Sequence, residues 1–208
     1  MKILLLDIDE TVYPKDHGPI VLVNKRIESF VMSCCNLSQD EAQALRRKYA
    51  TRYGFTMGGL MRHYGVDPHK YLGDVHDVPI EDLLEPDPRL RYVLSELPNE
   101  VIAFSNAPRE YVMRVINTLG VADLFSDLFT IEFMDFVPKP YPYPYRKVLQ
   151  QYARLADECV VVDNHPANIR TAIDLGMKGV LVGSDEGTDA FFAIPDIYAI
   201  TRILDEVV

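Results

Sequence analysis

The sequence predicts an α/β fold in which a doubly wound parallel sheet carries a small helical cap inserted after the first strand. Short, continuous apolar runs recur along the chain, and helical patterns lie between them. Strands that alternate with helices are typical of parallel sheets covered on both faces. Residues 16–85 interrupt this rhythm, because they contain helical patterns and no evident strand. We therefore expect a Rossmann-like core of residues 1–15 and 86–208 and a cap of residues 16–85.

Five apolar runs are predicted to be buried strands, because each is continuous rather than alternating and ends in polar or small residues. They are Ile3 to Ile8, Val101 to Phe104, Leu128 to Phe133, Cys159 to Val162 and Gly179 to Val182. The helical patterns of the core are Arg109 to Leu119, Tyr145 to Ala156 and Asn168 to Leu175, the first and last followed by a glycine that can end a helix. The proline-rich segment from Pro138 to Pro144 predicts a stiff loop.

The predicted cap contains three helical patterns, Val21 to Cys35, Gln39 to Tyr53 and Thr56 to Tyr64, and then a polar segment that reaches Leu84. Ser38 followed by Glu41 has the spacing of a capping box, which begins the second of these helices, and Gly54 is placed to end it. We expect the cap to cover the active site and to move on two hinges, at Tyr13-Pro14 and near Pro86-Asp87-Pro88.

Length and composition indicate a globular protein with a small-molecule partner. A chain of 208 residues is long for one compact domain and short for two, which favours a core with an insertion. Apolar residues make up 48% and charged residues 25%, so a core of ordinary size can form. The net charge of −10 argues against nucleic-acid polymers and anionic membranes as partners. A small phosphorylated anion remains compatible, because a bound metal can reverse the local field.

The cysteines and the N-terminal residues predict a cytoplasmic location. Cys34, Cys35 and Cys159 lack the paired spacing of a metal site, and an adjacent pair has poor geometry for a disulfide. Reduced thiols are therefore expected. Met1 is followed at once by a strand-like run, and no long apolar segment occurs, so neither a signal peptide nor a transmembrane helix is predicted. Oligomeric state cannot be predicted from these residues.

Polar residues follow three of the predicted strands at the point where each strand ends. They are Asp7 and Asp9, Ser105 and Asn106, and Asp163 and Asn164. Ligands of doubly wound sheets bind outside the carboxyl ends of the strands, so these residues form the candidate site. Two carboxylates in one crevice are costly without a cation. Oxygen ligands without Cys or His favour Mg²⁺, which keeps water and substrate oxygens in its remaining positions.

Four segments along the chain carry a family resemblance. In order, they are Asp7-Ile-Asp-Glu-Thr11 with Val12-Tyr13-Pro14, Ser105-Asn106 after Val101-Ile-Ala-Phe104, Lys139 between two prolines, and Asp163-Asn-His-Pro-Ala-Asn168 with Leu175-Gly-Met-Lys178. Together they resemble the four motifs of the haloacid dehalogenase-like (HAD) hydrolases, and they span nearly the whole chain. The resemblance implies a Mg²⁺-dependent phosphatase that forms an aspartyl-phosphate.

The resemblance also implies a role for each matched residue. Asp7 would be the nucleophile, and Asp9 the acid and base, with its backbone carbonyl helping to hold the metal. Ser105 and the backbone N–H of Asn106 would bind the phosphoryl oxygens, and Lys139 would supply a fixed positive charge. Thr11 is expected to shape the loop after the strand rather than to react.

The fourth motif departs from the commonest family pattern, which has an acidic residue at the position of Asn164. An amide oxygen still binds Mg²⁺, so Asn164 is assigned as the direct ligand beside Asp7 and Asp9. Asp163 either steers Lys139 or ligates through water. Asn168 is expected to orient the ligating side chains from behind. With fewer negative ligands, the metal affinity should be weaker than is usual in the family.

Several alternatives to a metabolite phosphatase stay open at this stage. Dehalogenases of the family need neither a metal nor an acid two residues after the nucleophile, so Asp9 argues against that branch, whereas a phosphomutase is harder to exclude. A catalytically impaired protein that binds a phosphorylated ligand is a further alternative, because of Asn164.

The predicted cap bears a second, narrower resemblance, to the pyrimidine 5'-nucleotidase group. It rests on the first motif, on Tyr53-Gly-Phe-Thr-Met-Gly-Gly-Leu60 and on the segment from Lys70 to His76. It implies a nucleoside 5'-monophosphate as substrate, and the other candidates are a sugar phosphate and pyridoxal phosphate. Candidate cap contacts to the substrate are Tyr53, Met57, Arg62, His63 and His76.

Overall fold

A parallel six-stranded sheet forms the centre of the structure, a computed structural model that describes residues 3–97, 100–184, 186 and 191–203. The strand order is β3-β2-β1-β4-β5-β6, and each neighbouring pair is parallel. The strands are β1 (Ile3–Leu6), β2 (Glu100–Phe104), β3 (Asp127–Phe129), β4 (Cys159–Asp163), β5 (Lys178–Val182) and β6 (Phe192–Ile194). The predicted fold class, a doubly wound α/β sheet, is confirmed.

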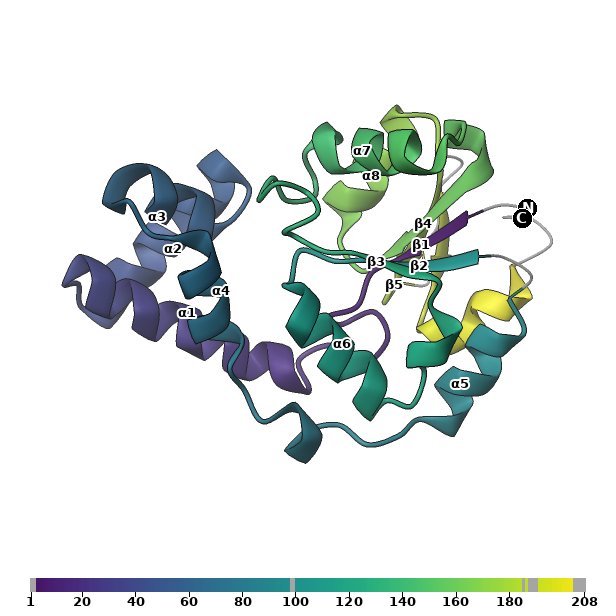
Figure 1. The fold of residues 1–208 in the computed structure, drawn as a ribbon, viewed down its shortest axis with the longest axis horizontal. Coiled ribbons are helices and arrows are strands. Elements are labelled where there is room, and N and C mark those ends of the chain that lie inside the picture. The colour runs from purple at the N-terminus through teal and green to yellow at the C-terminus, as the bar shows by residue number, and fades with distance from the viewer. Residues whose placement is uncertain (1–2, 98–99, 185, 187–190, 204–208) are drawn as a thin grey trace.

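Helices cover both faces of this sheet, as Figure 1 shows. Alternate side chains of β1 point to opposite faces. Leu4 and Leu6 join an apolar cluster with α5 (Pro88–Ser95) and α6 (Arg109–Thr118). Ile3 and Leu5 join another with α7 (Pro142–Tyr152) and α8 (Pro166–Asp174). Because both faces are buried, the strands are continuous apolar runs without a polar face.

Four helices beside the sheet make a separate lobe (Figure 1). They are α1 (Pro19–Cys35), α2 (Gln39–Tyr53), α3 (Thr56–Tyr64) and α4 (Pro68–His76), and the short helix η1 (Ile80–Asp82) follows them on the way back to the core. We call α1 to α4 the cap. The cap has an apolar cluster of its own, which includes Val31, Tyr49, Leu60 and Leu72.

The ends of α2 lie at the predicted residues. The Glu41 carboxylate accepts hydrogen bonds from the Ser38 backbone N–H at 2.9 Å and from the Ser38 hydroxyl at 2.6 Å. Gly54 ends the helix with a φ of 79°, a left-handed conformation that glycine adopts without strain.

Two predicted strands are shorter in the structure and one strand was missed. Strand β1 ends at Leu6 rather than at the predicted Ile8. The run expected to extend from Leu128 to Phe133 leaves the sheet after Phe129, and the chain then turns, so that Ile131 packs into the cap cluster. Ile131 alone of this run joins the cap cluster, whereas Leu128, Phe129 and Phe133 pack in the core clusters on the two faces of the sheet. Strand β6 was not predicted, because three residues are too few for a hydrophobic pattern.

Helix predictions fail mainly where a proline begins the helix. The polar segment after Tyr64 contains α4, α5 begins at Pro88, and α7 begins at Pro142 within the segment predicted to be a loop. Proline is favoured at the first helical position, where its missing N–H costs no hydrogen bond. Helix α7 also ends at Tyr152, before the predicted Ala156.

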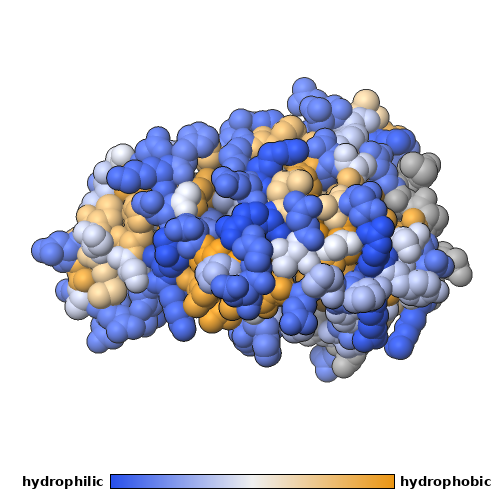
Figure 2. Space-filling view, turned by 60° about the horizontal axis from the view of Figure 1, so that its bottom comes forward, coloured by the Kyte–Doolittle hydropathy of each residue, from blue (hydrophilic) through white to orange (hydrophobic). Residues whose placement is uncertain are grey.

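The surface is mostly hydrophilic on the face that Figure 2 shows, with apolar side chains reaching it in several patches, the largest toward the middle of the molecule. None of the helices in the described ranges is both long enough and apolar enough to cross a membrane. The carboxyl ends of β1, β2 and β4 lie side by side in the sheet. The chain reverses its winding direction there, which is where ligands of such sheets bind.

Candidate active site

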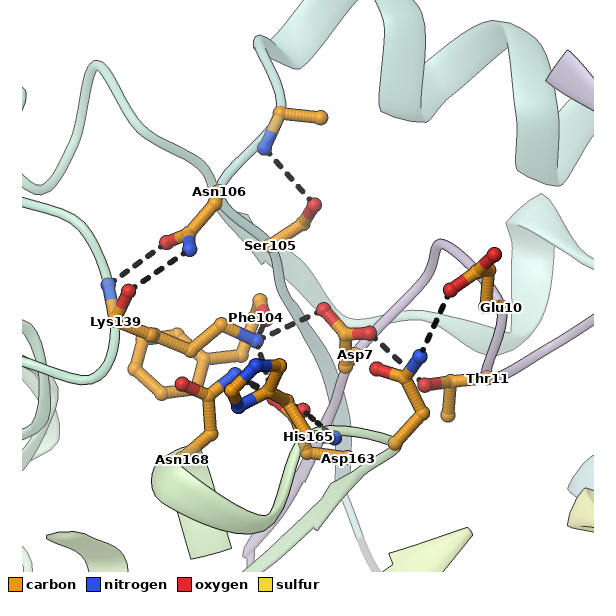
Figure 3. A network of polar contacts seen from close by, with 12 residues as sticks. Asp7, Glu10, Thr11, Phe104, Ser105, Asn106, Lys139, Asp163, His165 and Asn168 are labelled. Carbon is orange, nitrogen blue, oxygen red and sulfur yellow. Dashed lines mark hydrogen bonds and ion pairs between the residues drawn. The ribbon is translucent and has the colours of Figure 1, made fainter. Parts of the chain in front are cut away.

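Asp7 lies directly after β1, at the centre of this edge of the sheet. Its backbone N–H donates to the Val162 carbonyl at 2.9 Å, so the pairing with β4 continues to this residue. Oδ1 accepts a hydrogen bond from Lys139 Nζ at 2.8 Å, and Oδ2 accepts one from the Thr11 hydroxyl at 2.9 Å (Figure 3). Both oxygen atoms of Asp7 are thus held by the protein.

Lys139 also contacts Asp163, the last residue of β4, with 2.7 Å between Nζ and Oδ2. The Asn168 amide donates to both oxygens of Asp163 at 2.9 Å, and the His165 backbone N–H donates to Oδ1 at 2.8 Å. Asp163 is fully buried. Its two oxygen atoms are thus engaged by three donors, one of which is the Lys139 ammonium.

Asn106 fixes the backbone of Lys139 from the opposite side. Its side-chain amide accepts a hydrogen bond from the Lys139 N–H at 2.8 Å and donates one to the Lys139 carbonyl at 3.0 Å (Figure 3). Ser105 is buried beside it, and its hydroxyl oxygen accepts the Ala107 N–H at 3.1 Å. The hydroxyl proton of Ser105 therefore stays available to a ligand.

Asp9 and Asn164 line the same cavity as Asp7. One oxygen of Asp9, Oδ1, accepts hydrogen bonds from the hydroxyls of Tyr13 and Tyr111. The Asn164 amide nitrogen donates to Glu10 Oε2 at 3.3 Å. Within the described residues no hydrogen bond reaches the amide oxygen of Asn164, so this oxygen is available to a cation.

Burial and neighbouring charges set the protonation of these groups. Burial raises the pKa of Asp7 to about 7, although Lys139 opposes that rise. Burial also raises the pKa of Asp9, while hydrogen bonds from Tyr13 and Tyr111 oppose it. For Lys139, burial alone would lower the pKa, but the Asp163 and Asp7 carboxylates outweigh it and raise the pKa above its ordinary value. Lys139 is therefore a permanent cation.

The donor set around Asp7 fits a hard divalent cation. The side chains of Asp7, Asp9, Glu10 and Asn164 line one cavity and offer oxygen atoms. Within the described ranges, no three His, Cys, Asp or Glu side chains are grouped so that they could hold a metal. A cation here would therefore need water or substrate oxygens as further ligands. Two or three oxygen ligands, completed by water and substrate, suit Mg²⁺, whereas Zn²⁺ favours nitrogen and sulfur.

The cavity has a volume of about 400 Å³ and lies between the sheet edge and the cap. This size is typical of sites for small molecules. Its core side carries the polar residues described above, together with Ser105, His165 and Asn168. The cap contributes apolar and aromatic side chains, among them Val23, Ile27, Phe55, Met57, Tyr71 and Leu72, and the polar side chains of Asn24, Arg46, Thr56 and His76.

Only some of the predicted cap contacts line this cavity. Met57 and His76 do. Tyr53 and His63 instead line a separate hollow, where the Tyr53 hydroxyl lies 2.7 Å from His63 Nε2. Arg62 is not among the residues of either cavity.

Sequence reasoning missed two residues of the site. Arg46 lies in the cavity with its guanidinium donating to the Asn24 carbonyl and side-chain oxygen, each at 3.0 Å. Tyr111 reaches Asp9 from a helix more than a hundred residues later in the chain. No sequence motif marks either residue.

A comparison of sequences finds the family and a relative. The family model for haloacid dehalogenase-like hydrolases matches residues 1–176. Phosphate metabolism protein 8 of Saccharomyces cerevisiae is 26% identical over 198 residues, which are 86% of this chain and 61% of that protein. The chain thus spans about three-fifths of the length of this relative.

Solved structures of similar fold include a HAD phosphatase from Thermococcus onnurineus, with a TM-score of 0.65, 19% identity and 98% of each chain covered. A HAD-hydrolase from Bacillus subtilis bound to magnesium has a TM-score of 0.62, 14% identity and the same coverage. L-2-haloacid dehalogenase from Xanthobacter autotrophicus, with chloropropionic acid covalently bound, has a TM-score of 0.61, 17% identity and all of each chain covered. At these identities the likeness extends to the fold alone.

Proposed function

Because the chain belongs to the haloacid dehalogenase-like hydrolase family, we propose that it is a magnesium-dependent phosphatase that hydrolyses a small phosphomonoester through an aspartyl-phosphate. The observation that carries the proposal is the shared cavity of Asp7 and Asp9. A carboxylate at the position of Asp7 can attack carbon or phosphorus. Asp9 favours phosphorus, because it supplies the acid that the leaving oxygen of a phosphate ester needs.

In the first step, a carboxylate oxygen of Asp7 attacks phosphorus and the bond from phosphorus to the ester oxygen breaks. Protonated Asp9 gives its proton to that oxygen, and the alcohol leaves. In the second step, water attacks the phosphorus of the aspartyl-phosphate and transfers a proton to Asp9. The bond from phosphorus to the Asp7 oxygen breaks, which releases inorganic phosphate and restores both side chains.

The residues around Asp7 stabilise the phosphoryl group during both transfers. Lys139 supplies a fixed positive charge, held by Asp163 at 2.7 Å. Ser105 and the backbone N–H of Asn106 donate hydrogen bonds to the phosphoryl oxygens. When bound, Mg²⁺ adds positive charge at the same oxygens.

We assign Asn164 as a direct ligand of Mg²⁺, together with the Asp7 carboxylate and the Asp9 backbone carbonyl. Asp163 steers Lys139 instead, because Lys139, Asn168 and His165 engage both of its oxygens. Thr11 and Asn168 act from behind by holding Asp7 and Asp163.

The cap side of the cavity supports a substrate with an apolar or aromatic leaving group. Phe55, Met57 and Tyr71 offer apolar surface to a ring, and Arg46 offers hydrogen-bond donors to its polar edge. A nucleoside 5'-monophosphate has both features, and pyridoxal phosphate shares them. A sugar phosphate uses the apolar wall less well.

A second candidate function is a binding protein for a phosphorylated ligand that has lost catalysis. The amide of Asn164, in place of a charged ligand, favours this alternative, because a weaker cation site slows phosphoryl transfer.

Turnover of p-nitrophenyl phosphate with Mg²⁺ tests the proposed function. The wild-type protein should release p-nitrophenol, and Asp7→Asn, which keeps the size of the side chain and removes the nucleophile, should not. Equal background release from both proteins would overturn the phosphatase assignment and favour the binding protein. A panel of nucleotides, sugar phosphates and pyridoxal phosphate then ranks substrates by kcat/KM.

A further inference from the structure

Two tyrosine hydroxyls converge on one oxygen atom of Asp9. Tyr111 Oη lies 2.7 Å from Oδ1, and the Tyr13 hydroxyl donates to the same atom. Tyr13 belongs to the loop after β1, and Tyr111 to α6. Only 4% of Tyr13 and 2% of Tyr111 is exposed, so both side chains are buried. A buried hydroxyl without a partner is costly. The two tyrosines and Asp9 therefore hold one another in place.

The other oxygen of Asp9, Oδ2, accepts no hydrogen bond from any residue within the described ranges. Asp9 lines the same cavity as Asp7. A carboxylate that is fixed through one oxygen has its remaining oxygen in a defined position. Oδ2 is thus the atom that can meet the leaving group of a substrate.

The rings of both tyrosines are anchored by residues at the two junctions between core and cap. The Tyr13 ring packs against Gly18, which directly precedes α1, so closely that a Cβ there would lie 3.2 Å from Cε2. The Tyr111 ring meets the edge of the His76 ring, at the end of α4, with 4.9 Å between centroids. Anchored rings fix the direction of their hydroxyls.

We propose that Tyr13 and Tyr111 are positioning residues of the hydrolysis, which hold Asp9 by Oδ1 and direct Oδ2 to the leaving oxygen. This proposal rests on the proposed function, because it concerns the group that would protonate the leaving alcohol. It adds two residues to the proposed site. Their contribution to kcat/KM should depend on how strongly the leaving oxygen needs to be protonated.

Two substrates of similar shape separate this role from a general structural one. Phenyl phosphate has a basic leaving oxygen that needs protonation, whereas p-nitrophenyl phosphate has a leaving group stable as an anion. The kinetic constant to compare is kcat/KM, since it reports events up to the transfer of the phosphoryl group to Asp7. The variants are Tyr13→Phe, Tyr111→Phe and the double variant, with Asp9→Asn as the reference for complete loss of the acid.

In the tyrosine variants, kcat/KM for phenyl phosphate should fall about tenfold more than kcat/KM for p-nitrophenyl phosphate. This difference is smaller than the roughly hundredfold or greater effect that is typical of removing a general acid altogether. The matched control is Tyr152→Phe, which removes a tyrosine hydroxyl 3.0 Å from Asp127 Oδ2, outside the cavity. It should leave both constants unchanged.

Equal losses for both substrates, or no loss, would overturn the positioning role while leaving the phosphatase assignment intact. Failure of the wild-type protein to exceed Asp7→Asn on either substrate would instead overturn the proposed function. A crystal structure of the double variant gives a readout independent of turnover. It should show that the Asp9 carboxylate has moved from its place in the wild-type protein. An unmoved carboxylate would contradict the proposal, whatever the kinetic constants of the variants are.

Discussion

Lys139 and Asp163 form an ion pair that solvent does not reach. Nζ lies 2.7 Å from Oδ2, with 2% of Lys139 and none of Asp163 exposed. The same ammonium also contacts Asp7 Oδ1 at 2.8 Å, so one cation compensates two buried carboxylates. Removal of a single partner from a buried ion pair leaves uncompensated charge, which costs more than the pair contributes.

Replacement of Lys139 by methionine should destabilise the protein in a pH-dependent way. We expect the free energy of unfolding to fall by about 3 kcal/mol near neutral pH. Burial already raises the pKa of Asp7 to about 7 in the folded state, and without the opposing ammonium this pKa rises further above that of the unfolded chain. Stability contributed by protonation is present at low pH and is lost as pH rises, so the loss in Lys139→Met should be smaller at about pH 5 than at about pH 8. Urea denaturation of the wild-type protein and of Lys139→Met at both pH values, with a chelator present to remove divalent cations, measures this loss of stability.

The double variant Lys139→Met/Asp163→Asn is the control for this prediction. It removes one of the unpaired carboxylates, so it should recover part of the lost stability at the higher pH. An equal loss at both pH values, with no recovery in the double variant, would show that Lys139 acts through packing rather than charge.

Asn164 should set the concentration of Mg²⁺ that the enzyme needs. Its amide oxygen has no hydrogen-bond partner within the described residues and lines the cavity with Asp7. Asn164→Ala should raise the Mg²⁺ concentration for half-maximal turnover of p-nitrophenyl phosphate by at least about tenfold, since even outer partners of a metal site contribute that much. Asn164→Asp should lower it, because a carboxylate binds Mg²⁺ more strongly than an amide.

Asn117→Asp serves as the charge-matched control, because Asn117 is exposed on α6. It should leave the Mg²⁺ dependence unchanged. An unchanged Mg²⁺ requirement in both Asn164 variants would remove Asn164 from the proposed ligand set.

The polar residues on the core side of the cavity were predictable because one sequence pattern recurs, a polar residue directly after an apolar run. Asp7, Ser105 and Asp163 each follow a continuous apolar run, and the ends of parallel strands meet at one edge of a sheet. Strands β1 to β5 were predictable for the same reason, since a buried parallel strand is apolar on both faces, whereas the three residues of β6 were too few to show such a run.

The partners of Asp9 and the cap wall were not predictable from the sequence. Tyr111 and Asp9 meet because α6 packs against the loop after β1, and no local pattern encodes that contact. Arg46 looks like one of several basic residues on a polar helix until α1 folds beside it. The missed starts of α4, α5 and α7 share a different cause: a proline at the first helical position looks like a loop residue in sequence.

Two glycines in the cap should respond to alanine in opposite directions. A Cβ on Gly59 would lie 2.1 Å from Cγ of Tyr49, a nearly buried ring of α2, so α3 and α2 must move apart. We expect Gly59→Ala to reduce the free energy of unfolding by about 1–3 kcal/mol, as in other overpacked cores, a cost larger than the gain in helix propensity.

Gly73→Ala is the matched control, since no atom outside α4 lies within 4 Å of a Cβ at this position. It should raise the free energy of unfolding by about 0.5–1 kcal/mol, because alanine favours the helix. Urea denaturation followed by circular dichroism gives both values. Equal effects of the two substitutions would contradict the close approach of α2 and α3.

His76 should make the protein less stable at acidic pH. Burial at the end of α4, against the Tyr111 ring, lowers the pKa of His76 to about 4, below its ordinary value of 6.5. Between these values the unfolded chain binds a proton that the folded protein does not, so the free energy of unfolding falls as pH drops from about 6.5 to about 4.

The variant His76→Gln tests this prediction, because glutamine cannot take up this proton. The difference in unfolding free energy between wild type and His76→Gln should therefore shift steadily against the wild type over this range, which isolates His76 from the buried carboxylates. Urea denaturation at a series of pH values measures that difference, with His69→Gln, at an exposed residue of the same helix, as the control. A constant difference across the range would mean that His76 binds its proton equally well in the folded and unfolded states.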